Sequence, residues 1–214
     1  VRIYAIFPQG AQARQSVDVS VTNGADLDEL KAMSFSHPGI TAEHTSGNNF
    51  KVTVAPDVPA GVYDVRVHGL FGTSNPRCFV VGSRPEIVET EGNNTREQAQ
   101  AVEVGTVINA RSNSAADVDF FKFTGAKGQR VLAECSAIRI DSRFHGELRL
   151  YSATGRRLGR SIALERRFDP LLDVTLPEDG EYFIRVSDFV YAGSNDYGYR
   201  LTVHDGPHID FVMP

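Results

Sequence analysis

Two short acidic segments carry the residues that are best suited to chemistry. They combine alternating glutamates, two neighbouring asparagines and an Asp-Val-Asp step: Glu89, Glu91, Asn93, Asn94, Asp117 and Asp119. Proteins bind Ca²⁺ with about six to eight hard oxygen ligands, most of them carboxylates and amide carbonyls. The sequence therefore predicts a Ca²⁺ site at which these side chains meet.

The same residues have a second interpretation that needs no metal. Asn94 is able to cap a short helical turn with Glu97 at its third position, and acids near a helix N-terminus are favourable in themselves. The acidic segment would then be a solvated hinge. The sequence leaves both interpretations open.

The segments on either side of these acids alternate apolar and polar residues, which is typical of half-buried strands. The chain has 19 glycines and 10 prolines, so turns are frequent. Upstream we predict the strands Ile3–Pro8, Ser16–Thr22, Met33–Ser36, Ile40–His44, Phe50–Val54, Val62–Val67 and Cys78–Val81. Downstream we predict Thr106–Ala110, Asp117–Phe123, Arg130–Ile140, Glu147–Tyr151, Leu171–Leu176, Glu181–Asp188 and Tyr197–Val203. The predicted fold class is all-β, with two β-sandwich domains.

The first 83 residues resemble the IPT/TIG immunoglobulin-like domains. The resemblance rests on Ile6-Phe7-Pro8, the Val17–Val21 strand before Asn23-Gly24, Pro59–Val65, and Gly72–Asn75 before Phe79-Val80-Val81. Pro85 marks the best linker, because proline cannot donate to a strand ladder. The predicted division is 1–83, 84–206 and a tail 207–214. The tail resembles Ile3–Pro8, and we expect it to begin a further module of a longer chain.

Residues 86–204 resemble the bacterial pre-peptidase C-terminal family, which is related to the collagen-binding domains of clostridial collagenases. The motifs are Glu91–Thr95 followed by Ala99, Asp117–Phe123, Gly128-Gln129, Leu148–Arg156 and Leu176–Val186. The resemblance implies a jelly-roll-like antiparallel sandwich that binds or assists and does not catalyse. It also implies Ca²⁺ binding by the six acidic-segment residues, although Asn94 stands where those relatives often have aspartate, which should weaken affinity.

The resemblance places the chain in an exported bacterial protein, as a module for binding or adhesion to an extracellular protein or polysaccharide. Two alternatives remain, namely a secretion or maturation appendage of a peptidase elsewhere in the parent chain, and a structural spacer. The chain contains no signal peptide, so export rests on the resemblance alone. A peptidase in the parent chain would favour the appendage, and repeated modules would favour adhesion or spacing.

A basic segment offers a possible binding surface. Residues 139–167 contain eight arginines and only three acids, within a chain whose net charge is −5. An exposed patch of Arg156, Arg157, Arg160, Arg166 and Arg167 would suit an acidic polysaccharide or protein. The alternative is a solvated sheet face whose charges discourage aggregation.

A long loop rich in tyrosine, residues 188–199, is a second candidate for binding. Tyrosine supplies apolar contact area with a polar end, as binding loops require. The alternative is that Tyr197 and Tyr199 belong to one sheet face and that the loop is merely long.

Other functions find little support in the sequence. The negative net charge disfavours nucleic-acid binding, and no apolar run approaches the length of a membrane span. The six histidines are scattered, and no known catalytic motif occurs, so we do not expect an enzyme. Cys78 and Cys135 fall in different predicted domains and are expected to be free thiols.

Overall fold

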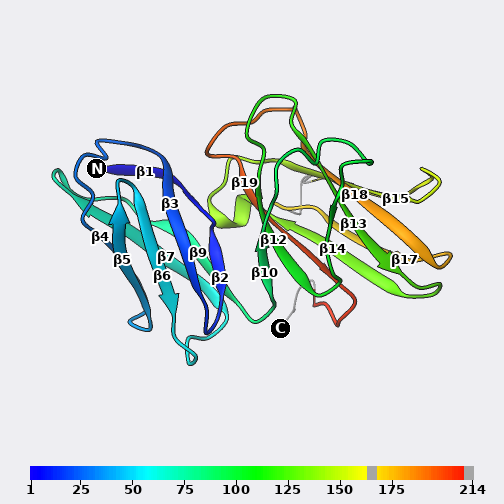
Figure 1. Ribbon diagram of the computed structural model, residues 1–214, viewed down its shortest axis with the longest axis horizontal. Helices are drawn as coiled ribbons and strands as arrows, with labels where there is room; N and C mark the ends of the chain where they lie inside the picture. Colours follow the sequence, from blue (N-terminus) through cyan, green and yellow to red (C-terminus); the bar gives the residue numbers. More distant parts are fainter. Residues whose placement is uncertain (163–167, 210–214) are drawn as a thin grey trace.

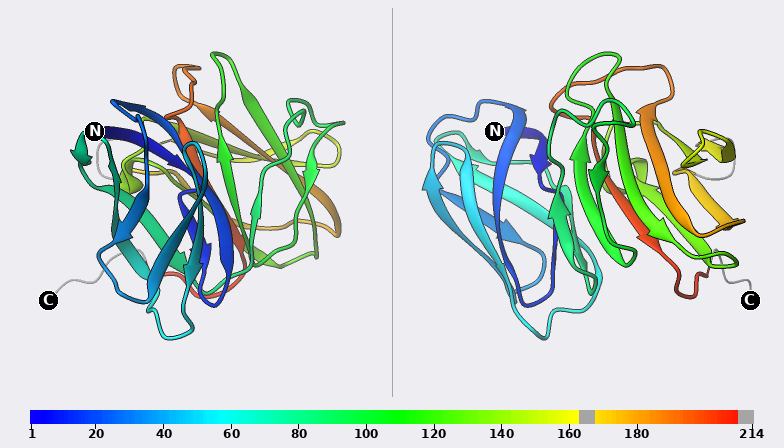
Figure 2. Two further views of the ribbon diagram at one scale, coloured as in Figure 1. Left: turned by 60° about the vertical axis from the view of Figure 1, so that its left-hand side comes forward. Right: turned by 45° about the vertical axis from the view of Figure 1, so that its right-hand side comes forward.

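The computed structural model describes residues 1–162 and 168–209. The described residues form four β-sheets and no α-helix. Each half of the chain builds its own pair of sheets, and the two pairs lie side by side (Figures 1 and 2). The predicted all-β class is therefore confirmed.

The first half of the chain is a sandwich of two short sheets. One has the order β1 (Arg2–Phe7), β3 (Ser16–Ala25), β6 (Asn49–Val54), β5 (Ile40–Ser46). The other has the order β2 (Gly10–Gln12), β9 (Arg77–Gly82), β7 (Gly61–Gly69), β4 (Ala32–Phe35), and β8 (Gly72–Thr73) pairs with β7. The alternating valines and phenylalanines of β3, β6, β7 and β9 fill the space between the sheets, as their period of two predicts.

The second half contains two five-stranded sheets. The linker-side sheet has the order β10 (Glu86–Val88), β12 (Thr106–Arg111), β19 (Gly198–His204), β14 (Arg130–Ser136), β17 (Leu171–Thr175). The outer sheet has the order β11 (Gln100–Ala101), β13 (Val118–Gly125), β18 (Gly180–Asp188), β15 (Gly146–Ser152), β16 (Arg157–Ile162). Every second residue of β13, β18 and β15 points into a core that contains Phe121, Leu148, Leu150, Ile184 and Val186.

The two halves have separate cores but touch closely. Among the described residues, no sheet contains strands from both sides of Pro85. Arg200 is buried between the halves, where it donates to Glu86 (2.6 and 2.9 Å) and to Asn109 (2.7 Å). Gly10 lies against this side chain: a Cβ on Gly10 would be 2.2 Å from Arg200 Nη1, so only glycine fits. The division at residue 83 stays a prediction, which separate expression of residues 1–83 and 84–206 would test.

Two of the predicted elements were wrong. The segment after Asn94 forms a hydrogen-bonded turn and no helix, because the Asn93 carbonyl accepts from the Phe120 N–H (2.9 Å) and ties the chain to β13. The predicted strand Arg130–Ile140 ends at Ser136 and is followed by the 3₁₀ turn η1 (Ile138–Ile140). The Asp169 carboxylate accepts the N–H groups of Ile138 and Arg139, so these are lost to the ladder. Strand β16 was missed because its Arg-Leu-Gly-Arg sequence lacks apolar alternation.

Candidate functional site

The acidic segments meet at one end of the second sandwich. Glu89 follows β10, and its carboxylate accepts from the side chain of Asn93 (3.0 Å) and from the backbone N–H of Arg111 (3.1 Å). Asp119 lies in β13 at an inward position and is 1% exposed. Its Oδ2 accepts the hydroxyl proton of Tyr199 from β19, and its carboxyl group lies beside that of Glu89. The fold thus brings linker and strand together as the sequence predicted.

This cluster places negative charge where water cannot reach it. Burial raises the pKa of Asp119 to about 10, and the neighbouring charge of Glu89 raises it further. Burial also raises the pKa of Glu89 to about 7, although the hydrogen bonds from Asn93 and Arg111 oppose that change. Without a cation, burial and the neighbouring Glu89 therefore favour a proton on Asp119 at neutral pH.

The remaining predicted ligands lie around this pair at different depths. Asp117 is buried and accepts the N–H groups of Asn113 (2.8 Å) and Val118 (3.0 Å). Glu91 accepts from the side chain of Asn113, and its pKa is raised by partial burial and then by the charge of Asp117. Asn94 is exposed, so the structure does not bring it to the buried pair.

Two buried oxygens decide how well the cluster fits a cation. Asn93 Oδ1 and Asp119 Oδ1 are both buried, and neither has a hydrogen-bond partner. A buried acceptor without a partner is unfavourable, and both are hard oxygens of the type that Ca²⁺ prefers. Within the described part of the chain, no three His, Cys, Asp or Glu side chains already form a metal-binding set. The donor oxygens are of the types that Ca²⁺ prefers. Glu89, Asn93 and Asp119 would hold the ion, and Glu91 and Asp117 are the neighbouring acids.

No motif or spacing in the sequence marked Arg111 as a member of this cluster. Burial lowers the pKa of Arg111, while Glu91 and Glu89 act in the opposite direction. Its guanidinium lies 4.3 Å from the centre of the Phe7 ring of the first sandwich. Arg111 is thus a permanent positive charge that partly offsets the acids and joins them to the neighbouring half.

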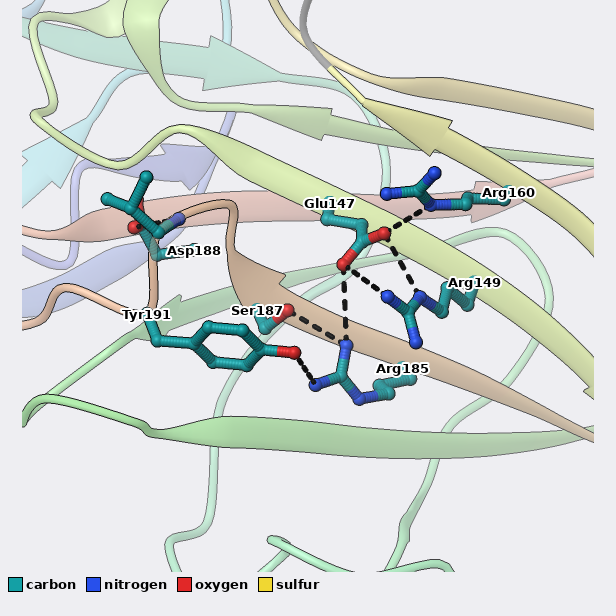
Figure 3. A network of polar contacts seen from close by, with 8 residues as sticks. Glu147, Arg149, Arg160, Arg185, Ser187, Asp188 and Tyr191 are labelled. Carbon is teal, nitrogen blue, oxygen red and sulfur yellow. Dashed lines mark hydrogen bonds and ion pairs between the residues drawn. The ribbon is translucent and has the colours of Figure 1, made fainter.

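A second charged cluster lies on the outer face of the outer sheet. The Glu147 carboxylate is 3% exposed and accepts two hydrogen bonds from Arg149 (3.0 and 2.9 Å) and one from Arg160. Arg185 Nη1 lies 3.7 Å from the same carboxylate. Figure 3 shows the three guanidiniums converging on this one acid from β15, β16 and β18. Burial alone would raise the pKa of Glu147, but the hydrogen bonds from Arg160 and Arg149 outweigh burial and keep it low.

The predicted arginine patch is only partly placed by the structure. Arg156 and Arg157 are exposed at the start of β16, and Arg160 contacts Glu147. Arg166 and Arg167 lie outside the described residues. The sequence analysis missed Arg185 and the central role of Glu147. The patch itself stays a prediction.

The tyrosine-rich loop divides into two parts. Tyr199 of β19 is 1% exposed, whereas Tyr197 precedes that strand and packs against the core. Phe189, Val190 and Tyr191 are exposed by 47%, 71% and 43%. The loop is fixed by the buried carboxylate of Asp188, which accepts from the N–H groups of Val190, Ala192 and His145 at 2.9–3.0 Å.

A cavity of about 460 Å³ lies between the two sandwiches. The charged side chains that line it are largely engaged with one another: Arg139 pairs with Glu134 and with Asp169, and Arg200 pairs with Glu86. Burial lowers the pKa of His204 on its wall, and its two cationic neighbours act in the same direction. These contacts link the residues that line the cavity to one another. Cys78 and Cys135 are free thiols, as expected.

The described residues contain no helix that is long and apolar enough to cross a lipid bilayer.

Comparisons with known proteins report on architecture. No protein-family model matches the chain, and no curated protein matches it. Among solved structures, the pre-peptidase C-terminal domain of collagenase from Bacillus anthracis is similar, with 14% identity over 57% of this chain and 99% of that chain and a TM-score of 0.39. A periplasmic inhibitor of g-type lysozyme from Aeromonas hydrophila has 13% identity over 56% of this chain and 97% of that chain, with a TM-score of 0.38.

A longer match is the protein SGBP-B of the mixed-linkage glucan utilization locus of Bacteroides ovatus, solved in complex with a heptasaccharide. It has 11% identity over 92% of this chain and 73% of that chain, with a TM-score of 0.29. We transfer no residue role and no ligand from these structures. The first of the three is a domain of the family that residues 86–204 resemble in sequence.

Proposed function

We propose that this chain is a non-catalytic binding module of an exported bacterial protein, and that Ca²⁺ fixes its linker to its second sandwich. The observation that carries the Ca²⁺ assignment is the pair of buried, partnerless oxygens, Asn93 Oδ1 and Asp119 Oδ1, beside the Glu89 carboxyl. A cation there would satisfy both oxygens and would replace the proton that burial favours on Asp119. No other oxygen cluster among the described residues combines buried carboxylates with unpaired acceptors.

The binding role rests on a different part of the molecule. Phe189, Val190 and Tyr191 are apolar side chains in an ordered loop that project into solvent, beside a cluster of arginines. Neighbouring exposed apolar side chains are characteristic of interaction sites. This arrangement favours a binding module over a spacer, because a spacer has no use for an ordered apolar loop.

Thermal unfolding tests the Ca²⁺ assignment. In millimolar Ca²⁺ the melting temperature should exceed that in chelator, because a ligand that binds only the folded state stabilises it by about 2.7 kcal/mol at a hundredfold excess over Kd. Asp119→Ala should abolish the difference. Asp173→Ala is the matched control, since Asp173 is an exposed acid of β17 that pairs with Arg130, and it should leave the Ca²⁺ effect unchanged.

Titration calorimetry with Ca²⁺ alone gives an independent measurement. One site per chain that is lost in Asp119→Ala is the expected result. An unchanged melting temperature, together with no heat of binding, would show that the acids are neutralised by protons alone.

A further inference from the structure

Three arginines form a row across the outer face of the outer sheet. Arg149 of β15 is directly opposite Arg185 of β18 on one side and Arg160 of β16 on the other. Adjacent strands are about 4.8 Å apart, so the row is roughly 10 Å long. Like charges in directly opposite positions destabilise a sheet, so folding alone gives no reason for this register.

One acid contacts this row within the described residues, 1–162 and 168–209. In these two ranges, Glu147 is the only acid that contacts any of the three guanidiniums. The nearest acid of the same face, Glu181, is paired with Lys122 at 3.4 Å. Within the described residues the row therefore carries two more positive charges than Glu147 balances, and Arg160 has 43% of its side chain exposed.

The row ends at the ordered apolar loop. The Tyr191 hydroxyl and Arg185 Nη2 are 3.3 Å apart, and the Arg185 guanidinium lies 5.7 Å from the centre of the Tyr191 ring (Figure 3). Tyr191 has a left-handed backbone conformation, with φ of 58°, and the Asp188 carboxylate fixes the backbone around it. A loop that is already ordered loses little conformational entropy when a ligand binds.

The geometry of the row restricts the class of ligand. Guanidinium groups bind carboxylates and sulfates through two parallel hydrogen bonds. The row runs across the strands, and both edges of β15 and β18 are already paired. A chain that lies over β15 and β18 therefore meets side chains and no free backbone groups, so the addition of an extended peptide is confined to the outer edge of β16, which pairs only with β15 in this sheet.

We propose that Arg185, Arg149 and Arg160 bind the carboxylate or sulfate groups of an acidic polysaccharide, with a sugar ring packed on Tyr191. This proposal rests on the binding role proposed above and names its ligand class. It is separate from the Ca²⁺ assignment, which concerns the opposite face of the same sheet.

Affinity electrophoresis and calorimetry at low salt, with heparin and polygalacturonate as acidic probes and dextran as the neutral one, test the proposal. Both acidic probes should bind, and binding should weaken with salt. Arg160→Gln should weaken it about tenfold, as expected for one lost charge-assisted pair. Arg160→Lys should weaken it less, because it keeps the charge but loses the fork. Tyr191→Ser should weaken binding to a similar extent at low and at high salt.

Arg130→Gln is the matched control, because Arg130 is an exposed arginine of the other sheet that pairs with Asp173. It should change affinity less than twofold, in keeping with its distance from the row. Equal losses in Arg130→Gln and Arg160→Gln would reduce the binding to net charge and overturn the proposal. Tighter binding of poly-glutamate or of single-stranded DNA than of either polysaccharide would overturn it as well. If the chain binds dextran or a protein, and this binding is unchanged in Arg160→Gln, the proposed ligand class is overturned but the proposed binding role stands.

Discussion

The two charged clusters lie on opposite faces of the outer sheet and differ in sign and in access to water. Asp119 of β13 pairs with Val186 of β18 and points inward, whereas Arg185, which precedes Val186 in β18, points outward. The inward acids cannot reach water and therefore need a proton or a metal ion. The outward arginines keep a surplus of charge because water solvates it. The same strand register therefore places buried acids that need a cation on one face of the sheet and arginines with surplus positive charge on the other.

Glu147→Gln should produce the largest effect, and it separates stability from binding. The substitution leaves three opposed arginines without an acid, so the free energy of unfolding should fall by about 2 kcal/mol. This is less than for a fully buried pair, because Arg149 and Arg160 reach water. Affinity for heparin should rise, since all three guanidiniums become available. Denaturant unfolding and calorimetry measure the two quantities.

Glu181→Gln is the control on the same face. Its partner Lys122 is exposed, and the loss should stay below about 1 kcal/mol. A Glu147→Gln variant that is destabilised but binds heparin no better would mean that the three arginines stabilise the sheet and do not bind the ligand.

Asp119→Asn should produce the second effect, which depends on pH. In chelator, the folded chain keeps protons on Asp119 and Glu89 at pH values where the unfolded chain has lost them, above about 3.8 and 4.5. The folded state then binds more protons, so the free energy of unfolding falls as pH rises, up to about 7 for Glu89 and about 10 for Asp119. Asparagine resembles the protonated acid and removes most of this loss.

In chelator, the stability of the variant relative to the wild type should therefore increase by at least ~1.4 kcal/mol, the value of one pKa unit, between pH 5 and pH 8. Melting curves from pH 5 to 9 measure the difference. Parallel curves for both proteins would mean that Asp119 titrates normally.

Much of the fold could be predicted because burial leaves a period of two in the sequence. The alternation of Leu148 with Leu150 and of Ile184 with Val186 gave both the strands and their inward faces. Strand β16 and the 3₁₀ turn at Ile138–Ile140 were not predicted, since the first lacks apolar alternation and the second depends on Asp169, about 30 residues away in sequence.

The acidic residues could be found from their types, but their depths could not. Asn93 is 1% exposed and Asn94 is exposed, although they are adjacent and chemically identical. The difference comes from the bond between Asn93 and the backbone of β13, which only the folded chain contains. The arginine row was hidden for a similar reason, because Arg185 and Arg149 are far apart in sequence and become neighbours through strand register.

The smallest effect concerns communication between the two faces. A Ca²⁺ ion at Asp119 would lie roughly 10 Å from Arg185, one strand away and across the sheet. At that distance in water, two charges interact by about 0.4 kcal/mol per pair, and physiological salt screens most of it. Since the ion adds positive charge, its direct effect on the polyanion is a weak attraction. We expect heparin affinity to change less than twofold between saturating Ca²⁺ and chelator at physiological salt. Calorimetry of the wild type and of Asp119→Asn measures this, since any Ca²⁺ effect on heparin itself persists in the variant. A tenfold change that Asp119→Asn removes would mean that the sheet couples its two faces through structure, because electrostatics across it is too weak to do so.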